Sequence, residues 1–302
     1  MKHAKKTRAP WILLACLAAI ALCIVAAVTL LQPNTNPKNI EIPGTRGNIP
    51  ATIQLPAKSA RGEELPLVVL CHGFTGNRQG DGHFAPLAED LAANGIATVR
   101  LDFAGCGDST EPYANYTLAN MAADGYMQAT YGTGKTALVG HSMGGRLASL
   151  YPQLGQYPVT ALALWSPANG TGLQGLEFLS IDNFAAVEEM AARADAEGSV
   201  AAWGVELSAA YIDGMRDSDP NATLQESGLP VLLTYSGNER ILSDTTQTET
   251  KAAVESLPDG QVVLDPFVNG DHNYTSEDPA TNTQLDADLR QVTVDFLTSH
   301  LQ

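Results

Sequence analysis

The strongest constraint in the sequence is a pair of glycines that brackets one serine. Gly140, Ser142 and Gly144 form a G-x-S-x-G pattern directly after the apolar stretch 136–139. A serine on a sharp strand-to-helix turn leaves no room for Cβ atoms two positions before or after it, because strand and helix approach closely there. Apolar residues at three- and four-residue steps over 147–154 predict the helix that must follow. A glycine-rich turn around a solvated serine is the alternative, but the sequence favours a reactive hydroxyl at Ser142.

Length and charge narrow the classes of protein that this chain can represent. With 302 residues, 44% of them hydrophobic, it can bury the core of one large or two ordinary domains. Its formal net charge of −16 repels phosphate backbones, so we expect no nucleic-acid partner. Four cysteines are too few for a disulfide framework. Cys71 and Cys106 end two expected strands, and whether they form a disulfide stays open.

The N-terminal segment predicts attachment to a membrane. Residues 1–10 form a basic tail, and residues 11–31 run without a charge for long enough to span a bilayer. The apolar run lacks a small-x-small cleavage site, which favours an uncleaved signal anchor over a cleaved signal peptide and a secreted product. The positive-inside rule places the tail in the cytoplasm. We therefore expect a single-pass protein of the cell membrane, with a tether at 32–38 and an extracytoplasmic domain at 39–302.

The domain at 39–302 alternates apolar strands with helices. A hairpin over 39–55 is expected at one edge. Six further strands are expected after the hairpin, at 67–71, 96–101, 136–139, 160–165, 231–235 and 261–264. This alternation predicts an α/β fold with a mostly parallel central sheet flanked by helices on both faces. The rhythm changes over 169–223, and we expect this segment, the cap insertion, to lie over a site at the carboxyl ends of the strands.

A second chemical feature follows the strand at 67–71. Residues 72–77, which we call the oxyanion loop, contain two glycines beside the expected nucleophile. Acyl transfer develops negative charge on a carbonyl oxygen, and backbone N–H groups in a tight turn can stabilise that charge. The backbone N–H groups of Phe74 and Met143 are the expected donors, although a plain turn after a strand would give the same local sequence.

A serine hydroxyl needs a base, and His272 is the best candidate in the chain. It stands on a loop after the last expected strand, and an imidazole there can accept the serine proton. The acid that orients it is expected in the loop after 231–235, which contains Glu239 and Asp244. We favour Glu239, because Asp244 is placed as the N-cap of a helix that starts at Thr245. The choice between the two acids stays open, whereas Asp102 is expected to cap turn N–H groups.

Four motifs, at 72–77, 102–109, 140–145 and 272–274, resemble the α/β-hydrolase superfamily, and within it bacterial cinnamoyl or feruloyl esterases and serine-aminopeptidase-like or monoacylglycerol-lipase-like hydrolases. The resemblance runs from about residue 40 to the C-terminus. It implies a Ser–His–acid triad, a cap between the sixth and seventh strands, and neither a metal nor an organic cofactor. The chain departs from the family pattern at Arg240, where those proteins usually have aspartate.

The expected activity is that of a serine hydrolase of the carboxylesterase or lipase type. A small-molecule ester would acylate Ser142, with aromatic residues of the cap insertion around the acyl group. Two alternatives remain open: a serine aminopeptidase-like peptidase, for which Glu177, Glu188 and Glu189 could bind a free amine, and a non-catalytic binding module on the same fold. The sequence predicts neither the ester nor the oligomeric state.

Overall fold

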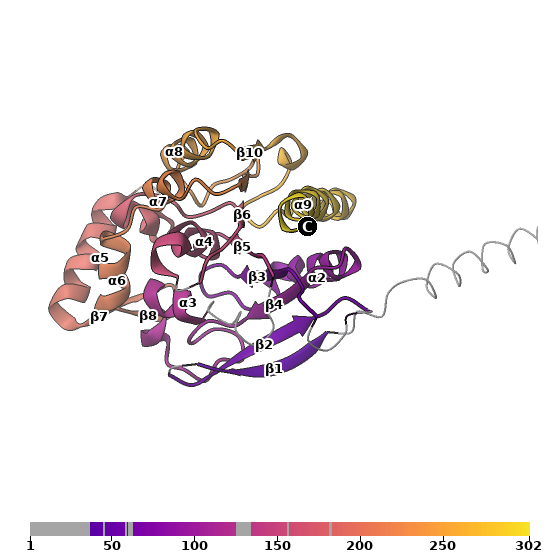
Figure 1. Cartoon of the computed structure of the whole chain (residues 1–302). Coiled ribbons are helices and arrows are strands. Elements are labelled where there is room, and N and C mark those ends of the chain that lie inside the picture. Colours follow the sequence, from indigo (N-terminus) through magenta and orange to yellow (C-terminus); the bar gives the residue numbers. More distant parts are fainter. Residues whose placement is uncertain are drawn as a thin grey trace, which may run out of the picture. The chain divides into compact units, whose positions relative to one another are not determined.

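Eight strands form the central sheet of the described part of the chain, in the order β1-β2-β4-β3-β5-β6-β9-β10 (Figure 1). They are β1 (Lys38–Pro43), β2 (Asn48–Gln54), β3 (Leu67–Cys71), β4 (Ala97–Leu101), β5 (Thr136–His141), β6 (Ala161–Trp165), β9 (Val231–Thr234) and β10 (Gly260–Val263). β1 pairs antiparallel with β2, and β2 with β4, while all later pairs are parallel. The mostly parallel sheet with an antiparallel hairpin at one edge confirms the expectation from the sequence.

This computed structural model describes residues 37–44, 46–57, 59, 63–124, 134–155, 157–180 and 183–302. The expected basic tail, the expected anchor at 11–31 and all but the end of the expected tether lie outside the described residues. Within the described ranges, no helix has both the length and the apolar character that a membrane span requires.

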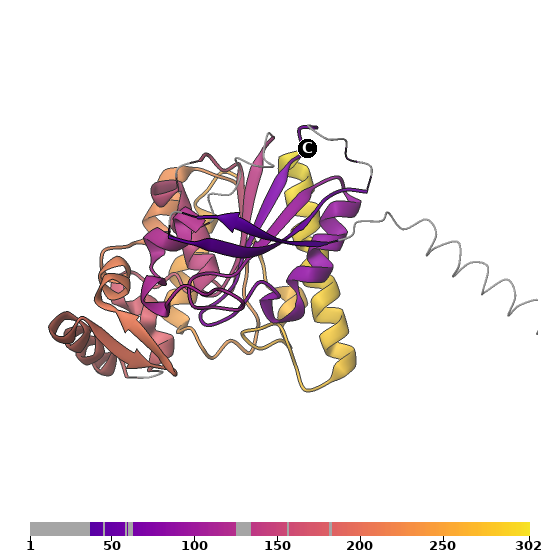
Figure 2. The ribbon, with the colours of Figure 1, turned by 90° about the horizontal axis from the view of Figure 1, so that it is seen from below.

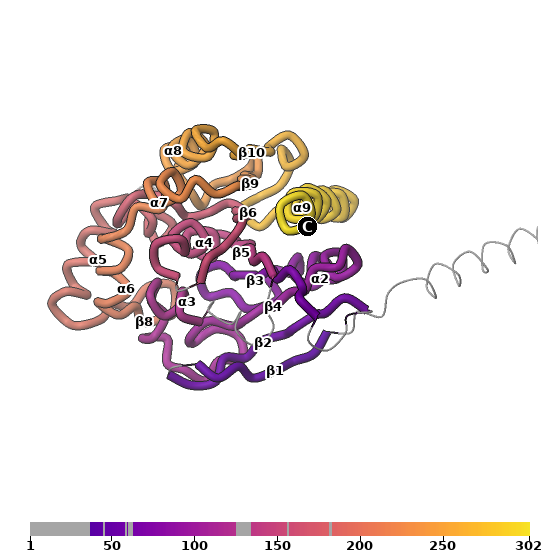
Figure 3. Tube along the Cα trace, in the orientation of Figure 1, coloured from indigo at the N-terminus to yellow at the C-terminus, as the bar shows by residue number. Residues whose placement is uncertain are grey.

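Helices cover both faces of the sheet (Figures 1 and 3). On one face, α2 (Phe84–Ala93) and the long α9 (Pro279–Leu301) lie side by side, as Figure 2 also shows. On the other face lie α3 (Leu118–Asp124), α4 (Met143–Leu154), α7 (Pro220–Ser227) and α8 (Asp244–Glu255). α3 follows a threonine cap, since the Asn120 amide donates to Thr117 Oγ1 at 3.2 Å.

The core consists of two apolar layers, one on each face of the sheet. Alternate residues of the fully buried strand β3 point into different layers: Val68 and Leu70 into the layer under α2 and α9, and Val69 into the layer under α4. A strand buried on both faces must be apolar at every position, which explains the unbroken run in the sequence. The register aligns Cys71 with Gly140, so that β3 and β5 end at the same level and their loops meet.

The cap insertion contains structure of its own between β6 and β9. It contains the 3-10 helix η4 (Gly172–Leu179), α5 (Phe184–Glu197), the hairpin of β7 (Ser199–Ala202) and β8 (Val205–Ser208), and α6 (Ala209–Arg216). The boundary expected near residue 223 falls inside α7, which packs against α4 and α8 of the body. Short 3-10 turns occur elsewhere: η1 (Gly80–Gly82), η2 (Tyr113–Asn115) and η5 (Asp265–Phe267).

One helix start differs from the expectation. Ser243, not Asp244, is the N-cap of α8, because its Oγ accepts a hydrogen bond from the amide of Thr246 at 3.2 Å. Asp244 is the exposed first residue of the helix, where its carboxylate faces the positive end of the helix dipole. The predicted N-cap at Asp244 was therefore wrong by one residue, since both side chains can cap and local sequence does not distinguish them.

Candidate active site

Ser142 occupies the sharp turn between β5 and α4 that its glycines predict. Its backbone has φ 53° and ψ −115°, a conformation that is strained for a residue with a side chain. A Cβ on Gly144 would lie 2.0 Å from the carbonyl oxygen of Cys71, and one on Gly140 would lie 2.2 Å from the carbonyl oxygen of Gly144. Both glycines are therefore required by close backbone approach.

The oxyanion loop lies directly against Ser142. A Cβ on Gly73 would come within 3.2 Å of the Ser142 Cβ. The loop turns tightly, with the Gly76 amide donating to the Gly73 carbonyl at 3.1 Å and Thr75 at φ 56°. Within the described part of the chain, the amides of Phe74 and Met143 donate no hydrogen bond. Unengaged N–H groups beside a serine remain available as hydrogen-bond donors.

Ser142 and His272 line one pocket of about 500 Å³ at the carboxyl ends of the parallel strands. Phe74, Phe178 and Trp203 contribute apolar walls, and the rings of Phe178 and Trp203 lie 5.1 and 6.3 Å from that of Phe74. Trp203 is 54% exposed. The pocket therefore has a reactive hydroxyl on one wall and an aromatic wall supplied largely by the cap insertion.

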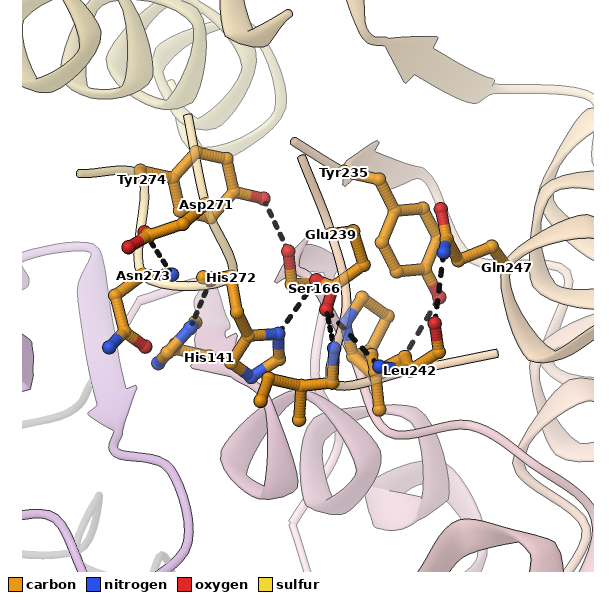
Figure 4. Close-up of polar contacts among 12 residues, drawn as sticks. His141, Ser166, Tyr235, Glu239, Leu242, Gln247, Asp271, His272, Asn273 and Tyr274 are labelled. Atoms are coloured by element: carbon orange, nitrogen blue, oxygen red, sulfur yellow. Dashed lines mark hydrogen bonds and ion pairs between the residues drawn. The ribbon is translucent and has the colours of Figure 1, made fainter. Parts of the chain in front are cut away.

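His272 forms a hydrogen bond with Glu239 through Nδ1. In a Ser–His–acid triad this nitrogen contacts the acid, and Nε2 faces the serine. His272 Nδ1 lies 2.7 Å from Glu239 Oε2 (Figure 4). The other carboxylate oxygen, Oε1, accepts hydrogen bonds from the amides of Ile241 at 2.8 Å and Leu242 at 3.2 Å. The acid is therefore fixed by its own loop.

The environment of Glu239 favours its charged form. Its side chain is 1% exposed, and burial alone would raise the pKa. The hydrogen bond and the positive charge of His272, together with the two backbone N–H groups, outweigh burial and hold the pKa of Glu239 below its ordinary value. Asp244 lies on the exposed start of α8 and Arg240 is exposed at the pocket wall, so only Glu239 of the loop's two acids contacts the imidazole.

Hydrogen bonds within the loop at 271–275, which we call the histidine loop, and between this loop and neighbouring elements hold it in place. Asp271 Oδ1 accepts from the amide of Asn273 at 3.0 Å, and the Tyr274 hydroxyl donates to the carbonyl oxygen of Thr234 at 2.9 Å. His141 Nε2 lies 3.0 Å from the carbonyl oxygen of His272 (Figure 4). Burial, together with the nearby His272, lowers the pKa of His141 to about 4, so His141 is neutral at physiological pH.

Asp102 has the structural role that its turn predicts. Its carboxylate accepts hydrogen bonds from the amides of Arg78 at 2.7 Å and Asp108 at 2.9 Å, and it also pairs with the Arg78 guanidinium. Cys71 and Cys106 are free and buried, and burial raises the pKa of each thiol to about 12. Both thiols are therefore unreactive at physiological pH.

The carboxylates expected to bind an amine do not reach the pocket. Glu188 and Glu189 are exposed on α5, and Glu177 Oε1 accepts a hydrogen bond from the amide of Ser243 at 2.9 Å. None of the three is among the described residues that line the pocket around Ser142. Among the same described ranges, no group of three histidine, cysteine or acidic side chains is arranged to bind a metal ion.

Arg146 supports the site from α4, a role that the sequence pattern did not predict. It follows Ser142 by one helical turn, is fully buried, and donates from Nη1 to the carbonyl oxygens of Ala168 at 2.8 Å and Gly170 at 2.6 Å. Its Nη2 donates to Ser218 Oγ at 2.8 Å. One guanidinium thus binds both ends of the cap insertion to the nucleophile's helix. A charged residue within the apolar sequence of α4 was the available signal.

Comparisons with known proteins agree with this architecture. Residues 66–193 match the family described as alpha/beta hydrolase fold. Est1E from Butyrivibrio proteoclasticus, solved with ferulic acid bound, is 19% identical with a TM-score of 0.67, over 85% of this chain and 99% of that one. The esterase domain of a Rhodothermus marinus protein is 17% identical with a TM-score of 0.63, over 88% and 100%. An esterase of Pyrococcus furiosus is 13% identical with a TM-score of 0.61, over 89% and 92%. A search of curated proteins found no matching sequence.

The strand order, the strained serine turn and the structural likeness to esterases all indicate the same fold. The resemblance drawn from the four sequence motifs is confirmed at the level of the fold. The chain has the α/β-hydrolase fold, and its structure is similar to those of Est1E and other esterases.

Proposed function

We propose that this protein hydrolyses carboxylic esters through a triad of Ser142, His272 and Glu239. The observation that carries the proposal is the 2.7 Å contact between His272 Nδ1 and Glu239 Oε2 in the wall of the pocket that Ser142 also lines. An imidazole fixed through Nδ1 has its Nε2 available as a base, and a buried carboxylate stabilises the imidazolium that forms.

The reaction proceeds in two steps. Ser142 Oγ attacks the ester carbonyl while His272 Nε2 takes the hydroxyl proton, and the oxyanion that forms accepts hydrogen bonds from the amides of Phe74 and Met143. The C–O bond to the alcohol then breaks, and the imidazolium returns the proton to the leaving oxygen. Water, deprotonated by His272, attacks the acyl-enzyme in the same way and releases the carboxylic acid and Ser142.

The acyl group is an aromatic or apolar one. Phe74, Phe178 and Trp203 line the pocket beside Ser142, and such rings favour stacked or edge-on contacts with another ring. Est1E, which resembles this chain in fold, was solved with ferulic acid, an aromatic acid. The aromatic wall is consistent with an acyl group of that kind.

Active-site labelling tests the proposal on the full-length chain. Wild-type protein should react covalently with a fluorophosphonate probe and hydrolyse p-nitrophenyl butyrate, and Ser142→Ala should lose both, because only a deprotonated serine attacks the probe. Ser299→Ala, which removes a hydroxyl on α9 far along the chain, serves as the matched control and should retain both. Labelling of Ser142→Ala at the wild-type rate would refute the assignment.

The same assay separates the alternatives. Turnover of an aminoacyl nitroanilide exceeding that of acyl esters would identify a peptidase, whereas a wild-type chain that neither labels nor hydrolyses esters would identify a binding module. The position of the carboxylates of the cap insertion outside the pocket favours the esterase.

We also propose that a signal anchor at 11–31 attaches the hydrolase domain to the outer side of the cell membrane. The proposal depends on the uncharged run after a basic tail. Full-length protein should sediment with membranes. Protease added outside intact cells should cut the hydrolase domain, whereas a cleaved, secreted product would appear in the medium.

A further inference from the structure

Two imidazoles outside the proposed triad bind consecutive carbonyl groups of the histidine loop. His141 Nε2 lies 3.0 Å from the carbonyl oxygen of His272, and His83 Nε2 lies 2.9 Å from the carbonyl oxygen of Asn273. His83 comes from the start of α2 and is 8% exposed. The backbone on either side of Asn273 is therefore held from two different elements of the fold.

The partners of His83 require it to carry a positive charge. Its Nδ1 lies 2.7 Å from Asp286 Oδ1 on α9, while its Nε2 faces the carbonyl oxygen of Asn273. A carboxylate and a carbonyl only accept hydrogen bonds, and a neutral imidazole has a single N–H to donate. Both contacts are hydrogen bonds only in the imidazolium form. In the neutral form, one ring nitrogen would direct a lone pair at an acceptor oxygen.

Neighbouring groups keep Asp286 ionised. Arg290 Nε donates to Asp286 Oδ2 at 2.8 Å, and Arg290 also pairs with Asp90 of α2. Burial opposes the charge on Asp286, but the hydrogen bonds and charges of His83 and Arg290 outweigh it and hold the pKa of Asp286 below its ordinary value. A carboxylate that remains charged is a permanent acceptor for His83.

The other groups around His83 come from each element packed against it. Asp81 of η1 supplies a second negative charge, Trp165 of β6 presents an uncharged ring at 6.4 Å, and His141 is neutral at physiological pH. Burial alone would lower the pKa of His83. The bonds to Asp286 and to the Asn273 carbonyl, together with the charges of Asp286 and Asp81, outweigh burial and raise the pKa of His83 above its ordinary value of 6.5.

We propose that His83 is a positioning residue for His272, and that its imidazolium form fixes the histidine loop by donating to the carbonyl group of Asn273. The role depends on the esterase activity proposed above only for its kinetic readout. When His83 loses a proton, its remaining N–H donates to the charged Asp286, because this hydrogen bond is stronger than the one to the Asn273 carbonyl. The Asn273 carbonyl then loses its donor and the loop gains freedom.

The sign of the pH dependence follows from the direction of the His83 pKa. A raised pKa means that the contact is complete at lower pH and is lost as pH rises through that pKa, above 6.5. We therefore expect kcat for p-nitrophenyl butyrate to fall on the alkaline side. The fall should be about three- to tenfold, since small displacements of a catalytic group have effects of this size or larger. KM should change little, because His83 does not line the pocket among the described residues.

Two variants of the full-length chain test the proposal through the pH profile. Asp286→Asn removes the charge that favours the imidazolium, so the alkaline limb of kcat should move to lower pH. The side chain of Gln in His83→Gln cannot titrate. The alkaline limb should therefore disappear, and kcat on the alkaline side should be lower than in the wild type and independent of pH. Asp288→Asn is the matched control and should keep the wild-type profile, because this half-buried position on the same helix has its Oδ1 bonded to Gln284 Nε2 at 2.8 Å.

Hydrogen exchange of the histidine loop gives a readout that needs no catalysis. After correction for the intrinsic pH dependence of exchange, amides at 271–275 of the wild type should exchange faster as pH rises. In Asp286→Asn, this acceleration should begin at a lower pH than in the wild type. A wild-type alkaline limb and wild-type loop exchange in Asp286→Asn would overturn the role of His83, even if His83→Gln failed to fold. Absence of fluorophosphonate labelling in wild type would overturn the proposed esterase activity instead, and loop exchange would still decide the role of His83.

Discussion

The imidazole of His272 lies 2.7 Å from the carboxylate of Glu239, a residue 33 positions earlier in the chain. The carboxylate divides its oxygens between two tasks: one binds the imidazole, and the other accepts the amides of Ile241 and Leu242. Glu239 thus lies one position before Arg240, the position at which the resembling proteins usually have their aspartate. The geometry requires only that a carboxylate of this loop reaches His272 Nδ1, and the longer side chain of glutamate satisfies that requirement.

Replacing Glu239 with glutamine should lower kcat for p-nitrophenyl butyrate by about 10³- to 10⁴-fold, because an amide can no longer fix the imidazole tautomer or stabilise its charge. KM should remain close to the wild-type value. Asp244→Asn is the matched control, since Asp244 lies on the exposed first turn of α8, and its kcat should remain near wild type. A larger fall for Asp244→Asn than for Glu239→Gln would transfer the acid role.

Trp203 should determine preference for aromatic acyl groups. It occupies the first of two turn positions between β7 and β8, at φ 48°, followed by Gly204 at φ 78°. Asparagine tolerates this turn geometry, so Trp203→Asn keeps the hairpin while removing the ring from the pocket. KM for an aryl ester such as methyl ferulate should rise about tenfold, the effect of losing roughly 1.4 kcal/mol of ring contact.

The control for Trp203 is Phe184→Ala, which removes a 40% exposed ring of α5 that is not part of the described pocket wall. It should leave KM for both aryl and acetyl esters unchanged. An equal rise in KM for p-nitrophenyl acetate and for methyl ferulate in Trp203→Asn would contradict an acyl-binding role of the ring.

Gly144→Ala should destabilise the fold by more than about 3 kcal/mol, since the new Cβ would overlap a backbone oxygen that cannot move without separating β3 from β5. The nearest atom to a Cβ at Gly214, inside α6, is 4.0 Å away. Gly214→Ala should therefore stabilise the protein by about 0.5–1 kcal/mol through its effect on the unfolded chain. Urea unfolding of both variants measures the contrast, and similar midpoints would refute the steric argument.

The fold should lose stability as pH falls from about 6.5 towards 4, because His72 is buried in its neutral form. Its Nδ1 lies 2.8 Å from the Gly73 carbonyl oxygen, and its Nε2 accepts the Phe103 amide at 3.2 Å. Burial lowers the pKa of His72 to about 4, so the unfolded state binds the extra proton over this range. Urea unfolding at pH 5 should show a free energy about 2 kcal/mol below that at pH 7 from this residue. Equal values at both pH values would contradict a neutral, buried His72.

The sequence predicted those parts of the fold that local pattern determines. Unbroken apolar runs marked the buried strands, and the glycines around Ser142 predicted the strained turn because sterics leave few alternatives at such spacing. His272 was proposed as the base because it stands on its own loop after the last strand, and the structure brings it to the pocket that Ser142 also lines.

The contacts that support the site were not predictable in the same way. His83 and Asn273 are separated by 190 positions, and Arg146 reaches residues up to 72 positions away. Local pattern records whether a side chain suits a helix or a strand, but it does not record which distant carbonyl that side chain meets. The choice of Ser243 over Asp244 as the cap depended on one residue of helix register, which propensity does not resolve.

Arg146 has a consequence for how proteins of this architecture diversify. Its guanidinium binds the chain where it leaves the body, at Ala168 and Gly170, and where it returns, at Ser218. The residues between these two stems supply Phe178 and Trp203 to the pocket wall but neither Ser142 nor His272, so substitutions at exposed positions of this segment can reshape the pocket without replacing those two residues. Substrate choice can thus evolve, or be engineered by exchanging this one segment, while the reactive chemistry is inherited unchanged.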